Sequence, residues 1–142
     1  MELSTRGRYA TRILVDLACR DKRQPARKKE IAESEDISVS YVAQLLMKLR
    51  AAGFVQSHRG VSGGFTLACD PGKVTVADIL EAMEGPISIA PCLNRSCART
   101  SVCVTQAVWK RAGQALRDVL KGITLADMAG RSMELRTSSF EI

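Results

Sequence analysis

Three cysteines lie close together in the second half of the chain and could bind a metal or respond to oxidation. Cys92, Cys97 and Cys103 follow the spacing C-x4-C-x5-C in a Pro-bounded segment. A loop can turn three sulfur atoms toward one centre, and thiolates favour zinc or iron–sulfur clusters, which normally need four ligands. The paired C-x2-C knuckles of common zinc folds are missing from this spacing. The pattern therefore favours an iron–sulfur cluster and leaves open a zinc site, a thiol switch or no site.

The other reactive side chains do not form a catalytic set. Cys19 and Cys69 are expected to pack in the core, because free cysteine is among the most buried residue types. The single histidine, His58, lies next to Arg59 in a polar stretch. The sequence contains no Ser/His/Asp arrangement, paired carboxylates, P-loop or dinucleotide fingerprint. We therefore expect that the chain is not an enzyme.

A second group of residues could contact nucleic acid. Gln44 can make paired hydrogen bonds to adenine, whereas serine and tyrosine more often bond phosphate. Arg59, at the tip of an expected hairpin, could enter a narrow minor groove. Lysines nearby would contact phosphates without choosing a sequence. The candidate DNA-binding residues are Lys28, Ser38, Ser40, Tyr41, Gln44, Lys48 and Arg59. The alternative is that these side chains form solvated polar faces of an ordinary helical domain.

The elements that must position these residues can be read from hydrophobic periodicity. Apolar spacing predicts helices over about residues 4–20, 27–35 and 38–52, the last capped by its first serine and stopped by a glycine. Two strand-like runs, 54–59 and 65–69, are joined by a glycine-rich tip typical of a hairpin. This order is that of a winged helix-turn-helix, whose third helix enters the major groove.

The second half of the chain has a different organisation. Capping-box spacing predicts a helix over 75–84, followed by a loop over 86–103 without periodicity. The helix expected over 104–121 has more apolar positions than a helix lying alone can bury, which indicates a dimer interface. A last short helix should begin near residue 124, and residues 131–142 resemble a frayed tail.

The predicted fold is mainly α with a small β-hairpin wing: a winged helix-turn-helix domain plus a long dimerisation helix. The expected parts are a DNA-binding domain over 1–72, a connecting helix and cysteine loop over 73–103, a dimerisation helix with a short C-terminal helix over 104–130, and a flexible tail over 131–142.

Composition limits the function classes. The chain has 142 residues, of which 46% are hydrophobic and 25% charged, and its net charge is +6. Residues 1–60 carry a net charge of +5 and residues 61–142 only +1, so the first half is the part suited to a polyanion. Without a long apolar stretch or a secretory signal, we expect no membrane span and a cytoplasmic location.

Several short blocks of sequence follow one another in a recognisable order. They cover residues 3–10, 37–41, 44–45, 49–53, 59–65 and 123–127. Together, over about residues 1–130, they resemble the IscR/NsrR/CymR family of bacterial winged-helix regulators, the Rrf2 family. The three-cysteine loop makes the chain similar to the iron–sulfur, IscR-type members rather than to cluster-free CymR.

The resemblance implies a homodimer paired through helix 104–121 and a sensor whose cluster state changes promoter affinity. By position, the loop cysteines match the cluster ligands, the residues at the start of the third helix match the recognition contacts, and Arg59 matches the minor-groove contact. Two positions depart from IscR: Gln106 replaces a histidine ligand, and Ala43 replaces a glutamate, so site preference should differ. The fourth ligand could be an amide, a hydroxyl, an exogenous molecule or a carboxylate such as Glu2 or Asp16.

We therefore predict a cytoplasmic, homodimeric transcription regulator that binds double-stranded promoter DNA and acts as a repressor. Its loop would hold a 2Fe–2S or 4Fe–4S cluster that senses iron–sulfur status, redox state or nitric oxide. One alternative is a cluster-free regulator of the same fold that is switched by a thiol/disulfide change. Another is a protein-interaction module that docks through the long apolar helix.

Overall fold

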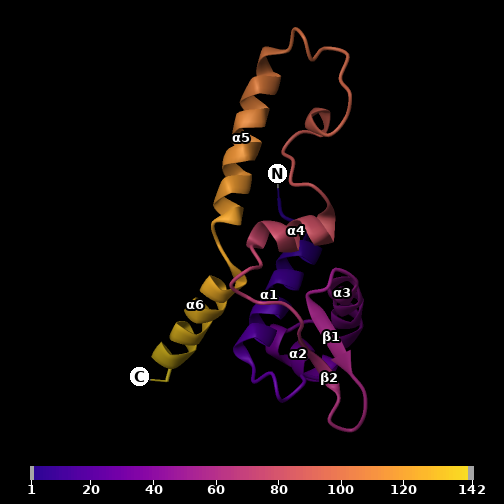
Figure 1. Ribbon diagram of the computed structural model, residues 1–142, viewed down its shortest axis with the longest axis vertical. Helices are drawn as coiled ribbons and strands as arrows, with labels where there is room; N and C mark the ends of the chain where they lie inside the picture. Colours follow the sequence, from indigo (N-terminus) through magenta and orange to yellow (C-terminus); the bar gives the residue numbers. More distant parts are fainter. Residues whose placement is uncertain (1, 141–142) are drawn as a thin grey trace.

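Helices dominate residues 2–140, which are the residues that the computed structural model describes (Figure 1). The helices are α1 (Thr5–Cys19), α2 (Lys28–Glu35), α3 (Val39–Ala51), α4 (Val76–Glu84), α5 (Val104–Lys121) and α6 (Leu125–Ser138). Strands β1 (Val55–His58) and β2 (Gly64–Leu67) form one antiparallel hairpin, and a short 3-10 turn, η1, covers Pro91–Leu93. The expected fold class, mainly helical with a small hairpin wing, is confirmed.

Side-chain caps explain where the helices begin. The Ser4 hydroxyl accepts a hydrogen bond from the Gly7 amide, at 3.1 Å, at the start of α1. Ser38 caps α3 in the same way. Thr75 and Thr124 open α4 and α6, each within a capping box completed by an aspartate three residues later. Each cap satisfies an amide that has no partner inside its helix, so the helix starts predicted from these residues are confirmed.

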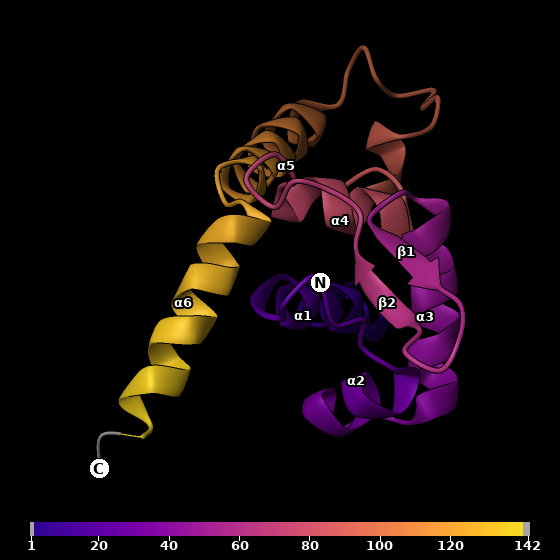
Figure 2. The same cartoon turned by 60° about the horizontal axis from the view of Figure 1, so that its bottom comes forward.

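Helix α1 lies at the centre of the molecule, between α6 on one side and α2, α3 and the hairpin on the other (Figure 2). Its apolar face supplies Ile13 and Leu14, both fully buried. The opposing side chains come from every neighbouring element: Ile31, Val42, Leu45, Leu46, Leu49, Val55, Leu67, Ile79 and Leu125. One hydrophobic core therefore fixes α3 and the hairpin against the same helix that contacts α4 and α6.

The cysteine-bearing half extends away from this core. Helix α5 and the loop over 86–103 lie at the opposite end of the molecule from the hairpin tip (Figure 1). The main contacts of α5 are with α4 and η1. Over the part of the chain that the structure describes, no helix is both long and apolar enough to cross a membrane.

The C-terminal helix corrects one prediction. Helix α6 continues to Ser138, so the flexible tail expected over 131–142 was wrong for residues 131–138; residues 141–142 lie outside the described part. Two ion pairs support the extension. Arg131 pairs with Glu134 along the helix at 3.0 Å, and Arg136 reaches Asp16 of α1 at 3.6 Å. The second pair depends on the tertiary fold.

Asp16 is a carboxylate in the interior, with a side chain only 2% exposed. It accepts hydrogen bonds from the Arg20 guanidinium at 2.8 Å and from the Ser34 hydroxyl of α2 at 3.0 Å. With Arg136, its partners come from three helices. A buried carboxylate is tolerated only with such compensation, so Asp16 connects α1, α2 and α6 at one point.

We predict that Asp16→Asn lowers the free energy of unfolding by about 2 kcal/mol or more, because Arg20 and Arg136 lose their counter-charge. Urea denaturation at fixed protein concentration measures this change. Asp21→Asn is the matched control, because Asp21 pairs with Arg23 in solvent. Equal effects of the two substitutions would show that the Asp16 network contributes no more than a surface pair.

Candidate nucleic-acid interface and cysteine loop

The outward face of α3 carries polar side chains at helical spacing. Ser40, Gln44 and Lys48 are exposed and stand four residues apart, so they lie along one side of the helix. The opposite side is the buried apolar stripe that fixes α3 in the core. The helix therefore presents to solvent a row of hydrogen-bonding side chains that take no part in the buried core.

Ser38 and Tyr41, at the start of α3, make contacts within the protein that fix the first turn of this helix. The Ser38 hydroxyl accepts from the Tyr41 amide at 3.2 Å and lies 3.3 Å from the Ser40 hydroxyl. The Tyr41 ring is half-buried and meets the Tyr9 ring edge to face, with centroids 6.0 Å apart. The Arg12 guanidinium lies over the Tyr9 ring, 4.7 Å from its centroid. The first turn of α3 is thus fixed in place by α1.

The hairpin carries an exposed cation of its own. Arg59 follows β1, is exposed, and has no ion-pair partner among residues 2–140. The strand pairing is fixed by a four-residue register, and the His58 ring bonds the Thr66 hydroxyl at 2.8 Å across it. Lys28 lies at the base of the hairpin, with its ammonium 5.9 Å from the centre of the Phe65 ring. Lys28 and Phe65 line one pocket with Arg50 of α3, so the exposed surface of α3 continues onto the base of the hairpin.

The three loop cysteines are free and half-exposed. Cys92 lies in η1, Cys97 lies in the open part of the loop, and Cys103 precedes the first residue of α5. Within the described residues, no group of three His, Cys, Asp or Glu side chains is arranged to hold a metal ion. The donor set, three thiols on one loop, fits a thiophilic metal or cluster in its chemistry, while this conformation does not gather the sulfur atoms.

The cysteines differ in acidity. Hydrogen bonds from the Thr105 side chain and the Gln106 backbone stabilise the Cys103 thiolate and lower its pKa. Burial raises the pKa of the Cys69 thiol, in agreement with its expected place against the core. Cys19 is also partly buried, and its thiol points to the Ala129 carbonyl oxygen at 3.6 Å. The structure therefore stabilises a thiolate at Cys103 of the loop and a neutral thiol at Cys69.

Two residues considered as further ligands have structural roles. Gln106 is buried, and its amide donates to the Thr100 hydroxyl across the loop at 3.4 Å. Asp16 is buried, and its carboxylate is bound by Arg20, Ser34 and Arg136. Glu2, in contrast, lines a groove together with Ile87 and Ile89 near the beginning of the loop.

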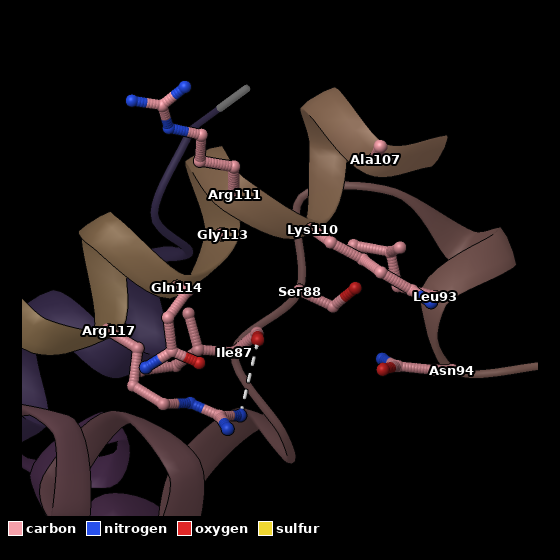
Figure 3. Close-up of a pocket in the computed structure, with 10 residues that line it drawn as sticks. All are labelled: Ile87, Ser88, Leu93, Asn94, Ala107, Lys110, Arg111, Gly113, Gln114 and Arg117. Atoms are coloured by element: carbon pink, nitrogen blue, oxygen red, sulfur yellow. Dashed lines mark hydrogen bonds between the residues drawn. The ribbon is translucent and has the colours of Figure 1, made fainter. Parts of the chain in front are cut away.

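The beginning of the loop rests on α5 over a hollow of about 630 Å³ (Figure 3). The Arg117 guanidinium donates to the Ile87 carbonyl oxygen at 3.5 Å and also pairs with Glu81 of α4 at 3.2 Å. Gly113 is buried beneath the loop, where a Cβ would be 3.8 Å from Ile89. Arg117 could not be identified from the sequence, because its two partners become neighbours only when α4, α5 and the loop are packed together.

The opposite face of α5 is an exposed apolar stripe. Val104, Val108 and Val119 are 83%, 56% and 61% exposed. Ala112 and Ala115 complete the stripe at intervals of three and four residues. An apolar stripe of this length facing solvent is typical of an interface.

Comparison with known proteins places these features in context. A profile described as Rrf2, an iron-dependent transcriptional regulator, matches residues 3–131. The Rrf2 protein of Nitratidesulfovibrio vulgaris is 40% identical over 131 residues, which cover 90% of this chain and 87% of that protein.

Two solved structures have the same architecture. The structure of CymR, the global cysteine regulator of B. subtilis, superposes with a TM-score of 0.78 and 35% identity, covering 92% of this chain and 98% of that one. IscR of T. potens superposes with a TM-score of 0.79 and 35% identity, covering 95% and 90%.

Proposed function

The chain belongs to the Rrf2 family of transcriptional regulators, and on that premise we propose that it is a homodimeric DNA-binding repressor with a cysteine-based sensor. The relatives named above include regulators and no enzyme, so the expectation of a non-enzymatic protein agrees with the family. From the proposed action on promoter DNA we infer a cytoplasmic location. The finer proposals concern the DNA contacts, the dimer and the signal.

The observation that carries the DNA-binding proposal is the row of exposed polar groups on α3 that continues onto the wing. Ser40 and Gln44 would face base edges in the major groove, and Lys28 and Lys48 would contact phosphates. Arg59 would enter the adjacent minor groove, where the potential is most negative. The positive charge of residues 1–60 supports this assignment.

The dimer proposal depends on the exposed stripe of α5. Pairing this stripe with the same stripe of a second copy would remove five apolar side chains from water around a two-fold axis. We call α3 and the wing of one copy its reading head. Two reading heads related by the two-fold axis would bind a pseudo-palindromic site with half-sites about one helical turn apart. A dimer thus accounts for a helix whose apolar face is left exposed by the rest of residues 2–140.

The sensor proposal assigns Cys92, Cys97 and Cys103 as ligands of an iron–sulfur cluster, as in the IscR-type relatives. Bound there, the cluster would supply a group sensitive to oxidants, nitric oxide and iron supply. The loop is connected to the reading head through this chain's own contacts: Arg117 links the beginning of the loop to α4, and the Ser4 hydroxyl of the α1 cap donates to Glu84 of α4. Ordering the loop would shift these contacts and bias the spacing of the two heads.

A second candidate is a thiol switch in a protein that binds no cluster. One observation favours it: the lowered pKa of Cys103, whose thiolate accepts a hydrogen bond from Thr105, makes that thiolate available for oxidation. CymR is also among the similar proteins, alongside IscR. The two candidates share the DNA-binding half and differ only in the chemistry of the loop.

Arg59→Ala should weaken binding to a duplex selected in vitro on the unsubstituted chain by about tenfold. It should also reduce the slope of log Kd against log salt by about one, because one phosphate-proximal charge is lost. Fluorescence anisotropy across a salt series measures both values. Arg131→Ala, which removes an arginine from α6 far from the wing, should change neither (Figure 2). Equal behaviour of the two variants would contradict the wing assignment.

Val108→Glu should convert the dimer to a monomer at micromolar concentration, because it places a charge at the centre of the apolar stripe. Sedimentation velocity reports the change in mass. Lys121→Glu serves as the control, since Lys121 lies on another side of the same helix and should leave the dimer intact. A chain that sediments as a monomer before substitution would exclude the proposed interface.

Cys97→Ser should abolish cluster loading. Anaerobic reconstitution of the unsubstituted chain with iron and sulfide should give a brown protein with visible charge-transfer absorption and stoichiometric iron and sulfide. The Cys97→Ser protein should stay colourless, and Cys19→Ser should load normally because its thiol contacts α6 rather than the loop. A colourless unsubstituted protein with one tightly bound zinc ion, or one whose loop forms a disulfide under peroxide, would contradict the cluster assignment.

A further inference from the structure

Three consecutive residues before and at the start of α2 contact the wing. The Ala26 amide and carbonyl both exchange hydrogen bonds with Phe65 of β2, at 2.9 and 2.8 Å. Lys28 places its ammonium over the Phe65 ring. Between them, the Arg27 guanidinium donates to the carbonyl oxygen of Val61, in the turn that joins β1 to β2. The base and the tip of the hairpin are thus attached to the same short segment.

The attachment at the base requires a close approach of two backbones. Gly64 has a φ of +153°, and a Cβ at this position would lie 2.5 Å from the Ala26 carbonyl oxygen. Only glycine permits this contact, so at the base of the wing the two backbones bond each other directly. The tip has no such backbone contact with α2. Its turn is closed by one hydrogen bond, from the Gly63 amide to the Gly60 carbonyl oxygen at 3.0 Å.

The backbone of Arg27 is itself held in place. Arg27 is the N-cap of α2 and has an extended backbone. Its amide donates to the Glu30 carboxylate in the first turn of the helix at 2.6 Å. The side chain therefore starts from a fixed point and reaches Val61, 34 residues further along the chain. A charged donor on a carbonyl oxygen is stronger than a neutral one, although solvent weakens it here.

We propose that Arg27 is a positioning residue for DNA recognition: by holding the Val61 carbonyl, it fixes the turn 59–63 so that Arg59 is directed at the minor groove. This inference depends on the proposed DNA-binding function of the wing. It assigns to Arg27 an indirect role, through Arg59, rather than the phosphate contact that an exposed arginine beside DNA would otherwise suggest. Its energetic value comes from reducing the number of wing conformations that binding must select.

The first test uses the full-length chain without DNA. In Arg27→Ala, amide exchange at Gly63 should become several-fold faster, because the turn loses its link to α2, while amides of β1 and β2 should keep their rates. Lys29→Ala is the control: Lys29 is exposed on the same helix and pairs with Glu33 at 4.0 Å, without contact to the wing. Unchanged exchange at Gly63 in Arg27→Ala would overturn the proposal whatever the DNA-binding results.

The second test is a double-mutant cycle with the selected duplex. Arg27→Ala should weaken binding about fivefold in the unsubstituted chain and less than about twofold when Arg59 is already alanine, because the two residues act as a unit. If the two losses multiply, Arg27 is an independent phosphate contact and the positioning role is wrong. Circular dichroism and thermal unfolding check that both variants keep the fold.

The two tests separate the inference from the function on which it depends. If Arg59→Ala has no effect on binding while exchange at Gly63 rises in Arg27→Ala, the contact exists but the wing assignment fails, and the positioning role is overturned with it. If Arg59→Ala weakens binding and Gly63 exchange is unchanged, DNA recognition by the wing stands and only the role of Arg27 is rejected.

Discussion

The burial of Asp16 is the constraint on which the arrangement of the helices depends. A carboxylate removed from water must be compensated by donors within the protein, and here they come from α1, α2 and α6. Helices α2 and α6 both contact α1, whose apolar face also supports α3 and the hairpin. A shift of α2 or α6 would remove a partner of this buried carboxylate, so both helices keep fixed positions against α1.

The two halves of the molecule differ in how tightly they are specified. The reading half, from α1 to β2, has a continuous core, capped helices and a wing attached at base and tip. A surface that must match a rigid duplex needs such fixed supports. The half that carries the cysteines has an open loop, one 3-10 turn and a helix with an exposed apolar stripe. Arg117 lies where the loop, α4 and α5 meet, so a change in the loop can reach the reading half through α4. Local openness in one half and rigidity in the other suit a regulator whose affinity responds to a signal.

Most of the fold could be predicted from local patterns, because the signals for it are local. Ser38 and the apolar spacing behind it define α3, and the glycine-rich tip defines the hairpin. Contacts between distant segments could not be predicted in this way. The extension of α6 depends on Arg136 reaching Asp16, the burial of Gln106 depends on Thr100, and the Arg27 contact depends on where the hairpin packs. The candidate DNA-binding side chains could be identified from residue type and spacing, whereas the contacts that hold them in position required the folded chain.

Hydroxyl-radical footprinting of the full-length protein on a selected duplex tests the central claim most directly, because it maps protection of each sugar along the backbone and minor groove without altering the protein. Two copies of a head formed by α3 and the wing should protect two segments about one helical turn, or 10 base pairs, apart, with protected minor-groove positions flanking them. A single protected segment, or protection without the flanking minor-groove positions, would contradict the account.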